Sequence, residues 1–256
     1  MKDTIVLLAA DKASSHIVYH GLKKHFQIQR VILEERIAFG KLLKRRIRKL
    51  GITVVLGQIA FRLFIVPLLQ RVSTMRKKEI FKQFDLADHA IEESQIIRVP
   101  SVNDEKTIKA LQDLDPAIVV INGTRIISQK VIDCIPGRFL NMHAGITPLY
   151  RGVHGAYWSL AGHDRDHCGV TVHLVDKGID TGGILDQVVI QPAREDNFVT
   201  YPLLQIASGI PCLTRVVQTM LQGIVEEVAA PEGESRLWSH PTLVGYFWRY
   251  VRHRIK

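Results

Sequence analysis

The chain has 256 residues, of which 46% are hydrophobic and 23% charged, as is ordinary for a soluble globular protein large enough to bury a full core. Its three cysteines, Cys134, Cys168 and Cys212, are widely spaced and odd in number, which argues against a disulfide framework. The net charge of +9 is uneven: residues 36–82 hold thirteen Lys or Arg and one acid, Glu79, so the remainder sums to −3. This asymmetry indicates an anionic partner for that segment.

The N-terminal third begins with a β-α-β pattern. Thr4 to Ala10 is a continuous apolar run typical of a buried parallel strand, and it is too short for the core of a signal peptide. A helix from Ser15 to Phe26 and a strand from Ile28 to Leu33 follow. The loop from Asp11 to Ser15 lies at a helix N-terminus, where phosphate binding is favoured, although a simple capped helix start fits equally well. The loop lacks G-x-G-x-x-G, so no dinucleotide site is indicated.

The basic segment combines a cationic helix, Arg36 to Leu50, with an apolar run, Ile52 to Leu69. Gln58, Arg62 and Pro67 interrupt the apolar run, and an arginine near the centre of a membrane span is costly, so a span is disfavoured. The preferred interpretation is an inserted helical hairpin that packs on the domain with a solvated basic face. An interfacial helix drawn to anionic lipid, and binding to nucleic-acid phosphates, stay open.

The next elements lead to a second buried strand. Asn103 is expected to cap a helix from Asp104 to Leu114. Ala117 to Asn122 has the composition of a buried strand, and the glycine-led loop 123–127 follows it. A glycine at a strand end allows close approach to a ligand, while a plain β-α turn is the alternative.

Residues 138–187 carry the most informative polar groups. If residues 138–143 form a strand, Asn141 and His143 share a face. A second strand, 169–175, runs into the glycine-rich loop 176–183, which contains Asp180. The two strand ends are expected to deliver Asn141, His143 and Asp180 to one edge of a mostly parallel, twisted sheet in an α/β domain.

These three groups suit acyl transfer to an amine. Asn141 is a fixed donor to a carbonyl oxygen that gains negative charge, His143 is a general acid or base, and Asp180 orients the imidazole. No Ser or Cys at the motif supplies a nucleophile, which favours direct attack by the amine of the substrate. His173, which alternates with apolar residues, fits a satisfied strand histidine better than a catalyst. No metal site is expected, because His163, His167 and Cys168 do not complete one.

The C-terminal part is predicted to be a helix from about Tyr201 to Gln222, a polar linker, and a tail, 237–256, that combines aromatic residues with arginines. Such a tail favours an interface, either with a second subunit or with a membrane surface. The expected organisation is a catalytic domain, 1–192, with a basic helical insertion at 36–84, followed by a helical extension at 193–256.

The linked motifs N-x-H, P-x-Y-R-G and G-V-T-V-H-x-V-D-x-G-x-D-T-G, between about Pro116 and Pro192, resemble those of the folate-dependent formyltransferase family. That family includes glycinamide ribonucleotide transformylase, methionyl-tRNA formyltransferase and the sugar-nucleotide N-formyltransferases. The S-L-L-P that is common in the family after the histidine is replaced here by G-I-T-P, at 145–148. This departure leaves the triad intact and bears on the identity of the acceptor.

The resemblance implies a formyltransferase-like Rossmann-type fold and assigns roles to individual residues. Asn141, His143 and Asp180 would be catalytic, with 10-formyltetrahydrofolate as co-substrate and no metal. The folate would contact a set of residues in two loops: Gly123, Thr124, Arg125, Ile126, Asp176, Thr181 and Gly182. The acceptor would contact Ser14, Ser15 and Arg151.

The resemblance favours N-formylation of a nucleotide-linked amino sugar for surface polysaccharide or lipopolysaccharide synthesis. Roughly sixty residues follow Pro192, too few for the barrel domain of the tRNA enzymes, and the purine enzymes have a more glycine-rich first loop. Alternatives are a methionyl-tRNA or glycinamide ribonucleotide formyltransferase, a formyl-tetrahydrofolate hydrolase, or a non-catalytic membrane-associated scaffold. The expected location is the cytoplasm, with weak membrane-surface association through 36–82 as one option. A homodimer through the C-terminal region is a further expectation, and a nucleic-acid partner is not expected.

Overall fold

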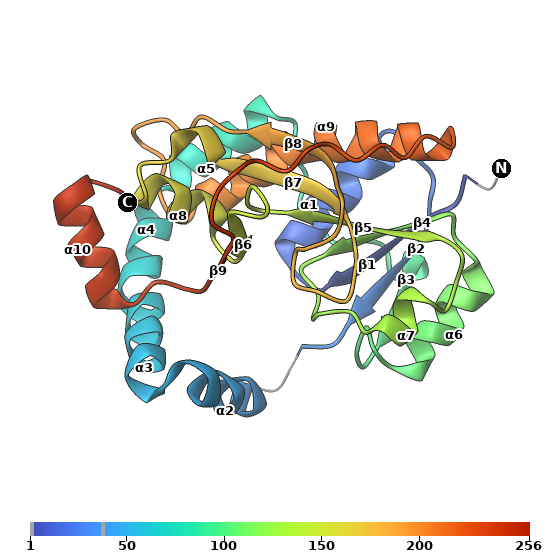
Figure 1. Ribbon diagram of the computed structural model, residues 1–256, viewed down its shortest axis with the longest axis horizontal. Helices are drawn as coiled ribbons and strands as arrows, with labels where there is room; N and C mark the ends of the chain where they lie inside the picture. Colours follow the sequence, from blue (N-terminus) through green and yellow to red (C-terminus); the bar gives the residue numbers. More distant parts are fainter. Residues whose placement is uncertain (1–2, 37–38) are drawn as a thin grey trace.

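The computed structural model describes residues 3–36 and 39–256, and within these ranges seven strands form one sheet in the order β3-β2-β1-β4-β5-β7-β8 (Figure 1). The strands are β1 (Ile5–Ala10), β2 (Ile28–Glu34), β3 (Ile96–Val99), β4 (Ile118–Asn122), β5 (Arg138–His143), β7 (Gly169–Leu174) and β8 (Ile184–Val189). Neighbouring strands from β3 to β5 are parallel. The predicted α/β fold with a mostly parallel sheet is therefore confirmed.

The two strands of the central motif, β5 and β7, run antiparallel, with Asn141 opposite His173 and His143 opposite Thr171. The carboxyl end of β7 consequently lies at the amino end of β5. The expectation that both strands end at the same edge is wrong. Asp180 reaches the site because the loop after β7 turns back along the sheet before β8 begins.

Helices cover both faces of the sheet (Figure 1). On one face, α1 (Ala13–Lys23) and α9 (Tyr201–Leu221) pack in one core cluster with β1, β5 and β7. On the other, α6 (Glu105–Leu114) and α7 (Gln129–Ile132) cover β1, β2 and β4. Central strands enclosed on both sides must be apolar throughout, as β1 and β4 are. The predicted boundary at residue 192 falls before α9, which the packing places within the main core.

The basic segment forms α2 (Phe39–Leu50), α3 (Ile52–Ala60), a π-helical turn (Phe61–Ile65), α4 (Val66–Val72) and α5 (Thr74–Gln83). In the described part of the chain, one helix is long and apolar enough to cross a membrane by length and composition. This is the continuous stretch Ile52–Val72, in which 17% of the apolar window is buried. The segment packs with α8 (Gly155–Ala161) and α10 (Leu243–His253) around Phe61, Ile80, Tyr157 and Tyr246.

Short elements complete the fold. A separate two-stranded ribbon pairs β6 (Tyr150–Gly152) with β9 (Arg236–Trp238), and single 3₁₀ turns lie at Glu93–Gln95 and Arg165–His167. The cap of α6 is Asp104, whose carboxylate accepts from the backbone N–H of Lys106. The predicted cap, Asn103, instead bonds to the loop that follows β4.

Candidate active site

The structure brings Asn141, His143 and Asp180 together at the end of β5. Asn141 and His143 are alternate residues on one strand and so project from the same face. One carboxylate oxygen of Asp180 lies 3.3 Å from Nδ1 of His143 and 3.4 Å from Nδ2 of Asn141. The three side chains that the motif singled out therefore form one contact group, although Asp180 comes from a returning loop.

A fixed loop conformation holds Asp180 in this position. Its φ of 53° lies in the left-handed region, which Asp and Asn tolerate better than most residues. Its second carboxylate oxygen accepts the backbone N–H of Gly152 at 2.9 Å. Farther along the loop, Thr181 donates to the carboxylate of Asp176, which also accepts the N–H of Gly178. Asp176 and Thr181 thus shape the loop that presents Asp180.

His143 is buried between two acceptors. Its Nε2 lies 2.8 Å from the carbonyl oxygen of Tyr150, and its Nδ1 faces Asp180. A neutral imidazole donates from one nitrogen only, whereas the imidazolium donates from both. Both ring nitrogens thus face an acceptor, and these contacts fix the orientation of the imidazole at the wall of the site.

His173 completes the hydrogen bonds around Asn141. Its Nδ1 lies 2.7 Å from the carbonyl oxygen of Leu174, so Nδ1 carries the proton and Nε2 accepts from Nδ2 of Asn141 at 3.1 Å. Burial lowers the pKa of His173, which favours this neutral form. The sequence interpretation of a satisfied strand histidine agrees with these bonds, yet it missed that the partner is Asn141. That contact follows from the pairing of β5 with β7, which places Asn141 opposite His173.

A cavity of about 570 Å³ adjoins the three residues. Its lining includes the loop Gly123–Ile127, apolar side chains of Met142, Val170 and Val175, and Lys12 and Ser14 at the start of α1. The volume falls in the range of small-molecule sites. Gly123 has a φ of 68°, and a Cβ there would approach only the side chain of Lys12, at 3.9 Å, so this position opens toward the cavity.

The loop that lines the cavity is tied down from outside. Asn103 donates to the carbonyl of Ile126 and accepts from the N–H of Ser128. The guanidinium of Arg125 pairs with the buried carboxylate of Glu34, with Nε 2.8 Å from the oxygen. The backbone N–H of Arg125 also donates to Glu34, at 2.8 Å, so both the side chain and the backbone of Arg125 hold the loop in place. Thr124 and Ile126 also line the cavity.

Four of the predicted ligand-binding residues do not line the cavity. Ser15 is completely buried; its hydroxyl donates to the carbonyl of Ala10 and accepts from Asn122, so it serves the fold rather than an acceptor. Gly182 lies against the backbone of β7, where a Cβ would fall 1.8 Å from the carbonyl oxygen of Leu174. Thr181 donates to Asp176, and Arg151 donates to the carbonyl of Ile179. Both side chains therefore hold the loop that carries Asp180, and neither lines the cavity.

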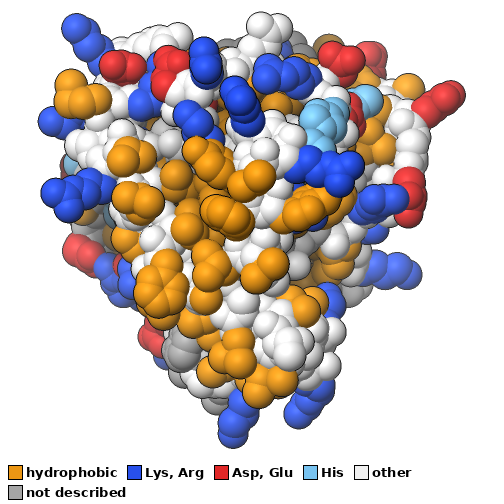
Figure 2. Space-filling model, turned by 90° about the vertical axis from the view of Figure 1, so that its left-hand side faces the viewer, with side chains coloured by type: hydrophobic (Ala, Val, Ile, Leu, Met, Phe, Trp, Pro, Cys, Tyr) orange, Lys and Arg blue, Asp and Glu red, His pale blue; other side chains and the backbone are white. Residues whose placement is uncertain are grey.

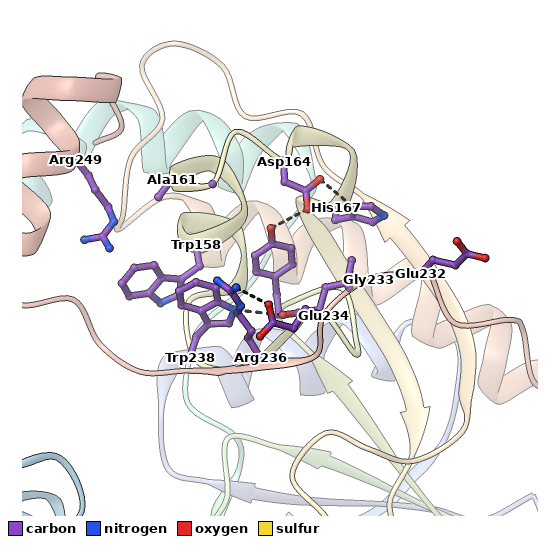
Figure 3. Close-up of a pocket in the computed structure, with 13 residues that line it drawn as sticks. Trp158, Ala161, Asp164, His167, Glu232, Gly233, Glu234, Arg236, Trp238 and Arg249 are labelled. Carbon is purple, nitrogen blue, oxygen red and sulfur yellow. Dashed lines mark hydrogen bonds and ion pairs between the residues drawn. The ribbon is translucent and has the colours of Figure 1, made fainter.

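A second cavity, of about 430 Å³, shares no lining residue with the first (Figure 3). Trp158 and Trp238 stack in its wall with centroids 4.6 Å apart, and Trp158 is buried. The polar groups here pair with one another: Asp164 accepts from Tyr150 and His167, and Arg236 pairs with Glu234. Within the described residues, no cluster of His, Cys, Asp or Glu could hold a metal ion. The groups suited to catalysis therefore lie in the larger cavity.

Comparison with known proteins agrees with this geometry. The family described as Formyl transferase matches residues 64–201, more than half of the chain. A methionyl-tRNA formyltransferase from Thermodesulfovibrio yellowstonii is 32% identical over 126 residues, which cover 48% of this chain and 40% of that protein. The chain spans less than half the length of the curated relatives it matches.

Solved structures resemble the fold over most of the chain. A phosphoribosylglycinamide formyltransferase from Anaplasma phagocytophilum has a TM-score of 0.58 at 16% identity, covering 93% of this chain and 98% of that one. A sugar N-formyltransferase from a Shewanella species has a TM-score of 0.55 at 14% identity, covering 91% and 76%. With the family match and the clustered Asn, His and Asp, these likenesses confirm the resemblance read from the motifs: the chain belongs to the formyl transferase family.

Proposed function

We propose that this protein transfers a formyl group from 10-formyltetrahydrofolate to a primary amine. The observation that carries the proposal is the contact group of Asn141, His143 and Asp180 at the wall of the larger cavity. The family match supports the same chemistry.

The larger cavity fits a folate. Its apolar lining suits a flat ring system, and the loop Gly123–Ile127 offers backbone groups for hydrogen bonds to the ring edge. That loop and Val175 would hold the folate. When bound, the folate supplies a formyl carbon activated for attack by an amine.

The residues of the chain then have separate tasks. Asn141 donates an N–H to the formyl oxygen as that oxygen gains negative charge; its present contact with Asp180, at 3.4 Å, is long and easily exchanged. The imidazole of His143 lies between the carbonyl of Tyr150 and the carboxylate of Asp180, and it can pass a proton to a reacting atom. Asp180, fixed by Gly152, stabilises the charged imidazole. The attacking nitrogen loses a proton, and the departing nitrogen gains one.

We further propose that the acceptor is an amino sugar carried on a nucleotide, made for surface polysaccharide. Sugar N-formyltransferases occur among the structures of the same fold. Lys12 and Ser14 line the cavity at the N-terminus of α1, where a cation and helix N–H groups favour a phosphate. Both features support an acceptor with an amine at the triad and a phosphate near α1.

The test is a formyl-transfer assay with 10-formyltetrahydrofolate and a panel of amines: nucleotide-linked amino sugars, glycinamide ribonucleotide, methionyl-tRNA, and water alone. We expect a formylated sugar, formed about a hundredfold or more slowly by His143→Ala. Formylation of glycinamide ribonucleotide or methionyl-tRNA instead would refute the proposed acceptor but would support formyl transfer to an amine. Release of formate without any formylated amine would identify a hydrolase and overturn both.

A further inference from the structure

Two helices far apart in sequence expose apolar side chains on one face of the molecule. The helix Ile52–Val72 contributes Leu63, Phe64 and Leu68, and α10 contributes Val244, Phe247 and Val251; each is between 58% and 78% exposed. Figure 2 shows apolar side chains gathered over one area of this face, with Lys and Arg side chains along its edges. We call this surface the apolar face. Contiguous exposed apolar surface of this kind marks an interaction site.

The two helices form a single rigid surface. Gly57 lets the start of α10 approach closely, since a Cβ there would fall 2.9 Å from the side chain of Thr242. Phe61 and Tyr246 pack with ring centroids 4.8 Å apart beneath the apolar face. The exposed residues of both helices are therefore presented together.

The helix Ile52–Val72 lies along the domain, with one side packed and the other exposed. Val55, Gln58 and Phe61 are buried, and Gln58 donates to the carbonyl of His240. Arg62 is exposed, but it follows the buried Gln58 by one helical turn and so lies at the edge of the packed side rather than in line with Phe64. The charge that interrupts the run in sequence therefore borders the apolar stripe as one more exposed cation, and the domain covers the opposite side along much of the helix.

Unpaired cations flank the apolar face. Lys44, Arg45, Arg48 and Lys49 of α2 are exposed, and none makes an ion pair within the described residues. The C-terminal residues 237–256 add four Lys or Arg and no acid. Exposed apolar side chains beside unpaired cations match the two components of an anionic bilayer surface, acyl chains and negative headgroups.

We propose that the apolar face docks on the surface of an anionic phospholipid bilayer, with the helix Ile52–Val72 and α10 lying in the plane of the interface. A crossing helix would draw the domain that packs along its buried side into the lipid. A second copy of the chain is disfavoured, because a symmetric dimer through this face would place one basic rim against the other. The proposal rests on the surface alone and does not depend on formyl transfer.

Co-sedimentation of the full chain with vesicles tests the proposal. We expect binding to phosphatidylcholine vesicles that contain phosphatidylglycerol at low salt, and little binding to phosphatidylcholine alone. Binding should weaken strongly at about 1 M salt, where the Debye length is ~3 Å. Arg45→Gln with Arg48→Gln should lower the partition coefficient about 30-fold, from the typical contribution of each basic group at such a surface. Arg46 is left intact, because it donates to Gln58 and supports the fold.

Matched variants separate the two components. Phe64→Gln with Phe247→Gln should reduce binding about tenfold or more, since each ring would otherwise enter the acyl region. Lys106→Gln with Arg138→Gln removes the same charge from exposed positions outside residues 36–82. Val189→Gln with Ile224→Gln changes two exposed apolar residues elsewhere on the surface. Both pairs should bind like the parent chain.

Three results would overturn the proposal. The first is no pelleting with anionic vesicles at low salt. The second is an equal loss of binding in the control pairs, which would indicate that binding depends on total charge or total exposed apolar surface and not on this face. The third is a dimer in analytical ultracentrifugation that Phe64→Gln with Phe247→Gln dissociates, without vesicle binding by the parent chain, which would assign the face to a second copy.

Discussion

Replacing Asp180 by Asn removes one charge from the proposed catalytic group and keeps its shape. Asn tolerates the left-handed backbone at this position, and its amide oxygen can still accept the N–H of Gly152. What changes is the partner of His143. In the unchanged protein, Nδ1 of His143 faces a carboxylate oxygen 3.3 Å away. In the variant, the same nitrogen faces a neutral amide.

The size of the effect follows from that one contact. A hydrogen bond to a charged group contributes ~1.5–3 kcal/mol, and each 1.4 kcal/mol is about tenfold in rate. Because the contact stabilises the protonated imidazole, its loss should appear in kcat, as a fall of about tenfold to 150-fold. The affinity for folate should change little, since the hydrogen bonds and ion pair that hold loop 123–127 do not involve Asp180.

The assay is steady-state formyl transfer to the acceptor that the panel identifies, with folate affinity from calorimetry. Asp186→Asn is the matched control, because that carboxylate lies on β8 and pairs with Arg215 outside the cavity. Thermal unfolding of both variants checks that the fold persists. A kcat for Asp180→Asn within about threefold of the parent would refute the role given to this carboxylate.

Three further predictions follow from named contacts. His143→Ala should lower turnover about a hundredfold or more, and near-normal turnover would exclude the ring as the proton carrier. Gly123→Val should weaken folate binding in calorimetry while the fold persists, because a β-branched residue disfavours the φ of 68° and meets no backbone; unchanged affinity would move the folate site. Burial lowers the pKa of His154 to about 3 and of His240 to about 4, so the unfolded chain binds more protons below pH 6.5. Stability should therefore fall as the pH drops from 6.5 toward 4, by about 2 kcal/mol per imidazole at pH 5. Chemical denaturation at several pH values measures this, and His154→Asn, which removes one titrating group, should reduce the slope; an unchanged slope would contradict the account.

The parts of the fold that the sequence predicted are those set by local patterns. β1 and β4 are continuous apolar runs, and strands enclosed by helices on both faces require such runs. The spacing of Asn141 and His143 was equally informative, because alternate residues of a strand share a face. Both inferences needed only the composition of a strand and the alternation of its side chains.

The parts that the sequence did not predict depend on partners distant in the chain. Nothing within Gly169–Leu174 specifies whether that strand runs parallel or antiparallel to β5, so the route of Asp180 to the site was misjudged. The burial of Ser15 depends on Asn122, more than a hundred residues away. Asp104 and Asn103 are both good capping residues, and the loop after β4 decides between them by engaging Asn103.

The basic segment shows how one residue can mislead a linear reading. Arg62 near the middle of an apolar run argues against a membrane only if the whole circumference of the helix faces lipid. In the folded chain, α10 packs on the side that contains the buried Gln58, and Arg62 lies exposed at the edge of that side. The exposed stripe then presents mainly apolar groups, among them Phe64 and Leu68. The charge that disfavours a spanning helix is therefore compatible with one lying in the interface. Because the helix is fixed to the domain by Phe61 and Ile80, docking at this surface would hold the whole protein beside the bilayer.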